Sequence, residues 1–172
     1  MINYDLRKIR GIVFDVDGVL SPSTIPMSED GVPVRMVNIK DGYAMQLAVK
    51  KGLKIAIITG AHNEAVKKRY HTLGVKDVFI AASVKLPVLR EWMAANGLEP
   101  EEVAFCGDDI PDVPCMNHVG LAIAPADAAV EALEAATYIS PRDGGYGVGR
   151  DIIEQTMRAQ GIWLSDNKAF GW

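Results

Sequence analysis

Short apolar runs alternate with amphipathic stretches along most of the chain. The apolar runs are rich in β-branched and aromatic residues, which is typical of strands buried in a parallel sheet. Strands are expected at residues 12–14, 53–58, 77–80, 103–106, 120–123 and 137–139. Helices are expected at residues 41–51, 63–73, from 127 onward, at 151–159, and at 84–95 with Ser83 as candidate N-cap. This alternation predicts a Rossmann-like, doubly wound α/β fold: a mostly parallel sheet with helices on both faces.

Residues 21–38 interrupt the alternation. Asp30-Gly31 is a turn signal between two apolar arms, so this segment is expected to form a β-hairpin. Pro26 and Pro33 cannot donate ladder hydrogen bonds, which places the hairpin at an edge of the sheet or projecting from the body. Because an isolated hairpin is marginal in water, its apolar side chains should pack either on their own domain or on a partner subunit.

The end of the chain also departs from the pattern. Four glycines between residues 142 and 150 predict a loop with unusual backbone freedom. Residues 161–172 carry two tryptophans and a phenylalanine without a helical or strand period. We expect this aromatic tail to dock on the rest of the protein.

Composition narrows the class of protein. The 172 residues, 49% hydrophobic and 23% charged, fit one globular domain spanning residues 1–172. A net charge of −4 argues against nucleic acid or an acidic membrane as main partner, but not against a small anionic substrate. Two cysteines are too few for a disulfide framework. The N-terminus lacks the apolar core of a signal peptide. No run of residues approaches the ~18 to 20 apolar residues that a membrane span needs. A cytoplasmic protein without a membrane partner is expected.

Polar residues that could act in catalysis or bind a ligand follow three of the predicted strands. They are Asp15 and Asp17, Thr59 and Gly60, and Asp108 and Asp109. The carboxyl ends of parallel strands meet at one edge of the sheet, where ligands bind. Carboxylates gathered there repel one another unless a cation lies between them, and hard oxygen ligands suit Mg²⁺. With a hydroxyl, glycine amides and the ammonium of Lys85 added, the sequence predicts a phosphoryl-transfer site with an aspartate nucleophile.

Each of these features alone has a plainer explanation. A lone Asp-x-Asp is more often a pair of loop aspartates that cap a turn or a helix, and Asp108-Asp109 could cap the following helix. Thr59-Gly60 alone is a turn at the end of a strand, and Lys85 alone is a surface helix residue. Their joint occurrence at strand ends, in this order and spacing, favours the functional interpretation.

Together these stretches resemble a known superfamily. The four motifs of the haloacid dehalogenase superfamily are similar to four stretches of this chain: residues 15–19, residues 57–60, Lys85 and residues 107–112. No stretch between the first and third motifs is long enough for a large cap domain. The hairpin, residues 38–43 and the glycine-rich loop resemble the capless branch of 3-deoxy-D-manno-octulosonate 8-phosphate phosphatases. In that family four subunits form a ring in which each hairpin helps to shape or cover a neighbour's site, so the resemblance implies a homotetramer.

The resemblance implies the central chemistry. Asp15 would attack phosphorus and form an aspartyl-phosphate. Asp17 would protonate the leaving sugar oxygen and then deprotonate the water that hydrolyses the intermediate. Mg²⁺ would bind the Asp15 carboxylate, the Asp17 backbone carbonyl and Asp108.

The resemblance also implies supporting roles. Thr59, the Gly60 amide and Lys85 would stabilise charge on the transferring phosphoryl group. Asp109 or Asp112 would orient the metal ligands or Lys85 from behind. The sequence leaves open which of these two acids does so.

Substrate selection rests on fewer signals. Asp41, Gly42, Arg69 and Arg142 match positions that border the sugar pocket in the relatives. An arginine is the natural bidentate partner of a sugar carboxylate; the alternative for Arg69 is a solvated helix residue beside two lysines. Ala61 offers no polar group, which favours an eight-carbon over a nine-carbon sugar acid.

The resulting hypothesis is a Mg²⁺-dependent phosphatase that converts 3-deoxy-D-manno-octulosonate 8-phosphate to the free sugar acid and phosphate, in lipopolysaccharide precursor synthesis. One alternative is a phosphatase for a nine-carbon keto-sugar acid 9-phosphate. Another is a non-catalytic oligomerisation module, because similar capless domains fused to sugar-nucleotide synthetases can serve assembly. The presence of every motif residue argues against this last alternative.

Overall fold

A six-stranded sheet organises the computed structural model, which describes residues 1–171. Its strands are β1 (Gly11–Phe14), β2 (Lys54–Ile58), β3 (Asp77–Phe79), β4 (Val103–Cys106), β5 (Leu121–Ala124) and β6 (Tyr138–Ile139). The strand order is β3-β2-β1-β4-β5-β6, and each pair of neighbours is parallel. The chain winds outward from β1 in both directions, so the carboxyl ends of β1 and β4 form a topological switch point, where such sheets bind ligands.

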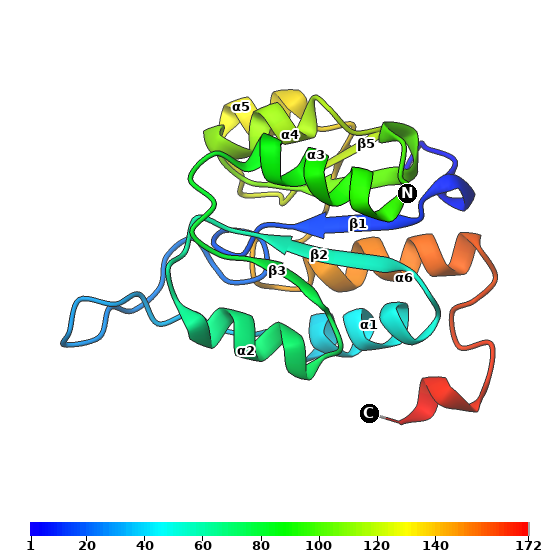
Figure 1. Cartoon of the computed structure of the whole chain (residues 1–172), viewed down its shortest axis with the longest axis horizontal. Helices are drawn as coiled ribbons and strands as arrows, with labels where there is room; N and C mark the ends of the chain where they lie inside the picture. Colours follow the sequence, from blue (N-terminus) through cyan, green and yellow to red (C-terminus); the bar gives the residue numbers. More distant parts are fainter. Residues whose placement is uncertain (172) are drawn as a thin grey trace.

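Helices cover both faces of the sheet (Figure 1). One face carries α1 (Ile39–Lys50), α2 (Glu64–Thr72) and α6 (Val148–Ala159), and the other carries α3 (Lys85–Asn96), α4 (Val113–Met116) and α5 (Val130–Ala135). Short 3₁₀ turns lie at Leu6–Lys8, Pro100–Glu102, Ile110–Asp112 and Asn167–Phe170. Alternate β1 side chains enter different cores, Ile12 and Phe14 on one face and Val13 on the other. The predicted doubly wound fold is confirmed.

The starts of three helices differ from the predictions. The N-cap of α3 is Val84, which makes no side-chain cap bond, so the expected cap by Ser83 is wrong. The chain turns at Ala81 (φ 58°), which leaves Ser83 outside the first turn of the helix. Helix α5 begins three residues after Asp127, whose carboxylate instead accepts a bond from the Gly144 amide. Helix α6 begins at Val148 rather than residue 151, because Asp41 caps it from α1.

Residues 21–38 form the projecting loop, which extends from the body of the protein (Figure 1). Its arms are joined by one isolated antiparallel bridge, Met27 to Pro33, rather than by the two regular strands expected. The prolines explain the difference, since they withhold two ladder donors. Met27 is 73% exposed and Met36 is 51% exposed. These two side chains of the projecting loop are therefore left uncovered by their own domain, whereas Ile25 is half-buried.

The docking expected for the C-terminal tail is confirmed at Trp163 and Ala169, which are buried, but not at Phe170, which is 77% exposed. Trp172 lies outside the described residues. Trp163 is buried and meets the ring of Tyr43 edge to face, at 6.1 Å between centroids. The Arg150 guanidinium lies over both rings. These contacts attach the tail to α1 and α6.

Candidate active site

Asp15 lies immediately after β1, where its backbone amide bonds the Cys106 carbonyl of β4. The residue is 6% exposed. One oxygen accepts a bond from the Val16 amide at 2.6 Å, and the other lies 2.8 Å from Lys85 Nζ. Burial and the negative charge of Asp112 raise the pKa of Asp15 to about 6, although Lys85 and the Val16 amide oppose the rise. The charged carboxylate therefore depends on nearby cations.

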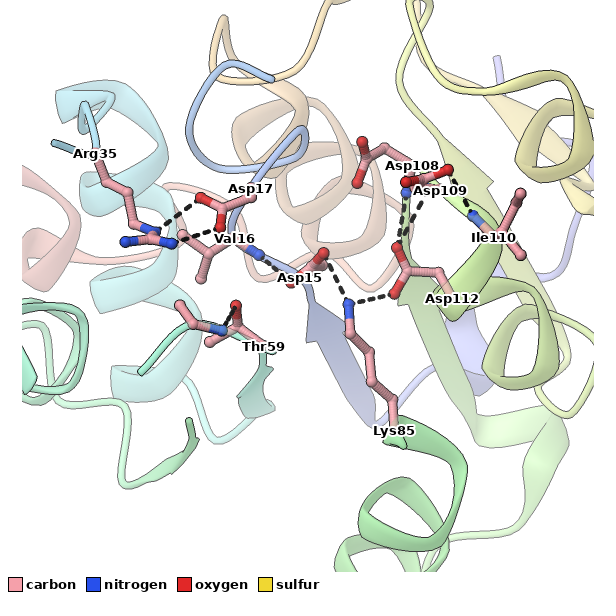
Figure 2. A network of polar contacts seen from close by, with 11 residues as sticks. Asp15, Val16, Asp17, Arg35, Thr59, Lys85, Asp108, Asp109, Ile110 and Asp112 are labelled. Atoms are coloured by element: carbon pink, nitrogen blue, oxygen red, sulfur yellow. Dashed lines mark hydrogen bonds and ion pairs between the residues drawn. The ribbon is translucent and has the colours of Figure 1, made fainter. Parts of the chain in front are cut away.

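Lys85 is the first residue of α3 and joins two carboxylates (Figure 2). Its ammonium is buried and lies 2.8 Å from Asp15 Oδ2 and 2.6 Å from Asp112 Oδ1. Burial opposes the charge, but the two carboxylates outweigh it and raise the pKa of Lys85. The second oxygen of Asp112 accepts bonds from the Asp108 and Asp109 amides at 3.0 and 3.4 Å. Asp112 thus ties Lys85 to the turn after β4.

Three carboxylates converge beside Lys85. Asp15, Asp108 and Asp112 each offer an oxygen, and these oxygens lie within 4.8 Å of one another. Burial, followed by the charges of Asp15 and Asp112, raises the pKa of Asp108 to about 8. A single ammonium does not balance three carboxylates, so the oxygen donors fit a divalent cation such as Mg²⁺. Gly18 (φ +80°) permits this close approach, because a Cβ there would lie 1.8 Å from Asp108 Oδ2.

Asp17 points away from Asp15 and toward the projecting loop (Figure 2). Both of its oxygens bond Arg35, at 2.8 Å from Nε and 2.7 Å from Nη2. Sequence analysis missed Arg35, since one basic residue in a loop carries no motif. The only available signal was its place in a segment that follows the Asp-x-Asp turn.

A cavity of about 360 Å³ unites most of the predicted catalytic residues. Its lining includes Asp15, Asp17, Thr59, Gly60, Lys85, Asp108, Asp109 and Asp112. Thr59 is buried at the end of β2, and its hydroxyl accepts a bond from the Ala61 amide at 3.2 Å. Ser23 and Ser83 also line the cavity, although sequence analysis did not place them there. The cavity combines carboxylates, a hydroxyl and an ammonium, as a phosphoryl group requires.

The predicted sugar-binding residues lie outside this lining. A small void of about 10 Å³ is bordered by Asp41, Gly42 and Arg69. Gly42 lies so close to Arg69 that a Cβ on Gly42 would be 2.6 Å from an Arg69 nitrogen. Arg69 also lines a cavity of about 350 Å³ between α2 and the projecting loop. Arg142 lines a separate groove with Tyr146.

Asp41 has a clear structural contact. The residue is 3% exposed, and its Oδ1 accepts a 2.7 Å bond from the Arg150 amide in the first turn of α6. Oδ2 is buried and has no partner among the described residues. Burial raises the pKa of Asp41 to about 6, although the bonds from Arg150 and Gly149 oppose the rise. Ionisation of the Asp41 carboxylate therefore lowers the stability of the folded protein.

We expect Asp41→Asn to change how stability depends on pH. The pKa of Asp41 in the folded protein, about 6, exceeds its ordinary 3.8, so the folded state binds more protons between these values. Wild-type stability should therefore fall as pH rises through this window, by about 3 kcal/mol at most, and the Asn variant should lack this loss. Urea unfolding of both proteins from pH 4 to 7.5 measures the difference. If the free energy of unfolding depended on pH in the same way in both proteins, burial of an ionised Asp41 would be refuted.

An aspartate beside a lysine, a threonine and further acids at the carboxyl edge of a parallel sheet is typical of enzymes that transfer a phosphoryl group to aspartate. Comparison with known proteins agrees, although no family model matches the chain. The 3-deoxy-D-manno-octulosonate 8-phosphate phosphatase of Escherichia coli K12 is 37% identical over 155 residues, covering 90% of this chain and 82% of the relative. The chain belongs to this phosphatase family, within the HAD superfamily.

Solved structures support the same assignment. The crystal structure of the Yersinia pestis phosphatase has a TM-score of 0.88 at 35% identity and covers 92% of this chain and 85% of that chain. The Moraxella catarrhalis phosphatase, solved in complex with a magnesium ion, a phosphate ion and KDO, has a TM-score of 0.89 at 27% identity. That likeness covers 97% of this chain and 96% of the Moraxella chain.

Proposed function

We propose that this protein hydrolyses 3-deoxy-D-manno-octulosonate 8-phosphate to the free sugar acid and phosphate, as a step in lipopolysaccharide precursor synthesis. The observation that carries the proposal is the buried contact of Asp15 with Lys85, next to Asp108 and Asp112. The chain that has this arrangement belongs to a phosphatase family named after this substrate.

The first half-reaction transfers the phosphoryl group to Asp15. A carboxylate oxygen of Asp15 forms a bond to phosphorus while the bond from phosphorus to the sugar oxygen breaks. Asp17 donates a proton to the leaving oxygen. Lys85, the Thr59 hydroxyl and the Gly60 amide stabilise negative charge on the transferring group. The products are the free sugar acid and an aspartyl-phosphate.

The second half-reaction returns Asp15 to its starting state. Asp17, now a carboxylate, takes a proton from a water molecule whose oxygen attacks phosphorus, and the bond to Asp15 breaks. We propose that Asp15, Asp108 and the Asp17 backbone carbonyl hold Mg²⁺, which supplies positive charge for the phosphoryl oxygens. Asp112 positions Lys85, whereas Asp109 uses its carboxylate to accept a bond from the Ile110 amide.

For the sugar, we propose contacts from Asp41, Gly42, Arg69 and Arg142. Arg69 is the best placed of these four, because it lines the cavity between α2 and the projecting loop. Ala61 lines the phosphate cavity and adds no polar group there, which supports the eight-carbon acid over a nine-carbon 9-phosphate.

Phosphate release from a panel of esters tests the function. We expect release to require Mg²⁺ and to favour the eight-carbon keto-acid phosphate over the nine-carbon acid and over simple hexose phosphates. Preference for the nine-carbon acid would retain the mechanism and refute the substrate. A folded protein that releases phosphate from none of them would support the assembly module instead.

We also propose a homotetramer in which the projecting loop packs on a neighbouring subunit. The exposed apolar side chains of this loop, among them Met27, Val34 and Met36, support this proposal. Sedimentation of the purified protein tests it, and a single species at the 18.6 kDa monomer mass would refute it.

We place the protein in the cytoplasm as a single domain over residues 1–172, with no nucleic-acid or membrane partner. Its net charge of −4 supports the absence of a nucleic-acid partner. Among residues 1–171, no helix combines the length and the apolar character needed to cross a membrane. Fractionation of cells that produce the protein tests the location.

A further inference from the structure

The contact between Arg35 and Asp17 joins the projecting loop to the phosphate cavity. Two nitrogens of the guanidinium face the two carboxylate oxygens, at 2.8 and 2.7 Å. The Arg35 side chain is only 13% exposed, whereas that of Asp17 is 42% exposed. This bidentate geometry is the most favourable arrangement for an arginine and a carboxylate, so it holds both groups firmly.

The same contact conflicts with the proposed task of Asp17. Asp17 has to present an oxygen to the leaving group, and both of its oxygens are occupied by Arg35. The contact must therefore open on at least one side during turnover. A guanidinium with so little exposure is costly when it lacks a partner anion, so opening favours a substrate that supplies a replacement.

A second cavity provides room for that replacement. The cavity of about 350 Å³ between α2 and the projecting loop is lined by both Arg35 and Arg69, together with Val16, Asn63 and Tyr70. Val16 and Arg35 line this cavity, while Asp17 lines the phosphate cavity. The ion pair of Arg35 and Asp17 therefore lies between the two cavities. Arg35 and Arg69 both line the second cavity, on the side away from the phosphate cavity.

We propose that Arg35 exchanges Asp17 for a carboxylate of the bound substrate and thereby selects acidic over neutral phosphate esters. This inference rests on the proposed function, which supplies a substrate with a carboxylate distant from its phosphate. An acidic ester frees Asp17 and leaves Arg35 paired. A neutral ester either leaves Asp17 held by Arg35 or leaves Arg35 without an anion, and both outcomes slow the reaction.

The test compares two esters that differ in one group, 6-phosphogluconate with a carboxylate at C1 and glucose 6-phosphate without one. We expect the wild-type enzyme to prefer the acid in kcat/KM. Arg35→Met should reduce that preference by roughly 10- to 100-fold, because kcat/KM falls much further for 6-phosphogluconate than for glucose 6-phosphate. Arg35→Lys should retain part of the preference. Arg90→Met, which removes an exposed charge on α3, is the matched control and should change neither ester.

Three results would overturn the inference. The wild-type enzyme could show no preference between the two esters, Arg35→Met could leave the preference unchanged, or the variant could lose activity equally on both esters. Equal loss would mean that Arg35 only positions Asp17. The eight-carbon acid phosphate, assayed in parallel, separates the two proposals. If Arg35 controls the preference for 6-phosphogluconate but the eight-carbon acid is a poor substrate, the proposed function fails and the role of Arg35 stands. If no ester releases phosphate, both fail.

Discussion

Asp15→Asn should lose turnover by roughly four to six orders of magnitude while the protein stays folded. An amide oxygen is a poor nucleophile toward phosphorus, and the aspartyl-phosphate cannot form without the carboxylate. The fold should tolerate the change, because Lys85 keeps its 2.6 Å contact with Asp112. Burial already disfavours the charge of Asp15, so the thermal unfolding temperature of the variant without divalent cations should equal or exceed that of wild type.

Asp109→Asn is the matched control for this prediction. It removes the same charge from the lining of the same cavity, but Asp109 is exposed, and an Asn oxygen can still accept the bond from the Ile110 amide. We expect its activity to stay within about tenfold of wild type, because no reacting group depends on it. Phosphate release and circular dichroism of both variants provide the measurements. Substantial turnover by Asp15→Asn would refute the nucleophile, and a comparable loss in Asp109→Asn would refute the division of roles among the acids.

The sheet and the core of the site were predictable because both follow from local patterns. Apolar runs such as residues 103–106 match the observed strand β4. Parallel strands end at a common edge, so the sequence alone places Asp15, Thr59 and Asp108 together. Lys85 was harder to place, because it reaches the site from the first turn of α3 rather than from a strand end. It was indicated by its order and spacing relative to the strand-end residues and by the resemblance to a motif.

Contacts between distant segments could not be predicted in the same way. The choice between Asp109 and Asp112 depends on the turn after β4, which directs Asp112 inward and leaves Asp109 exposed. Arg35 reaches Asp17 only because the projecting loop folds back across 18 residues. Asp41 caps a helix that begins more than 100 residues later. These interactions depend on tertiary packing, which sequence periodicity does not encode.

Lys85→Met should affect stability and activity together. The substitution leaves Asp15 and Asp112 buried, close to each other and to Asp108, with no ammonium between them. Removing one partner from a buried ion pair typically costs about 3 to 5 kcal/mol in the free energy of unfolding. Turnover should fall by roughly a thousandfold, because a charge that stabilises the transferring phosphoryl group is lost. Urea unfolding without divalent cations and phosphate release with Mg²⁺ measure the two effects.

A second variant separates lost charge balance from lost packing. If repulsion between carboxylates causes the destabilisation, Lys85→Met combined with Asp112→Asn should be more stable than Lys85→Met alone, since one of the repelling charges is gone. Arg10→Met, which removes an exposed guanidinium that lies 3.0 Å from Glu102, is the control on the surface and should cost much less stability than Lys85→Met. A double variant that is no more stable than Lys85→Met would mean that repulsion between the carboxylates does not cause the destabilisation. The restored stability should not restore turnover, because the ammonium that faces the phosphoryl group is still missing.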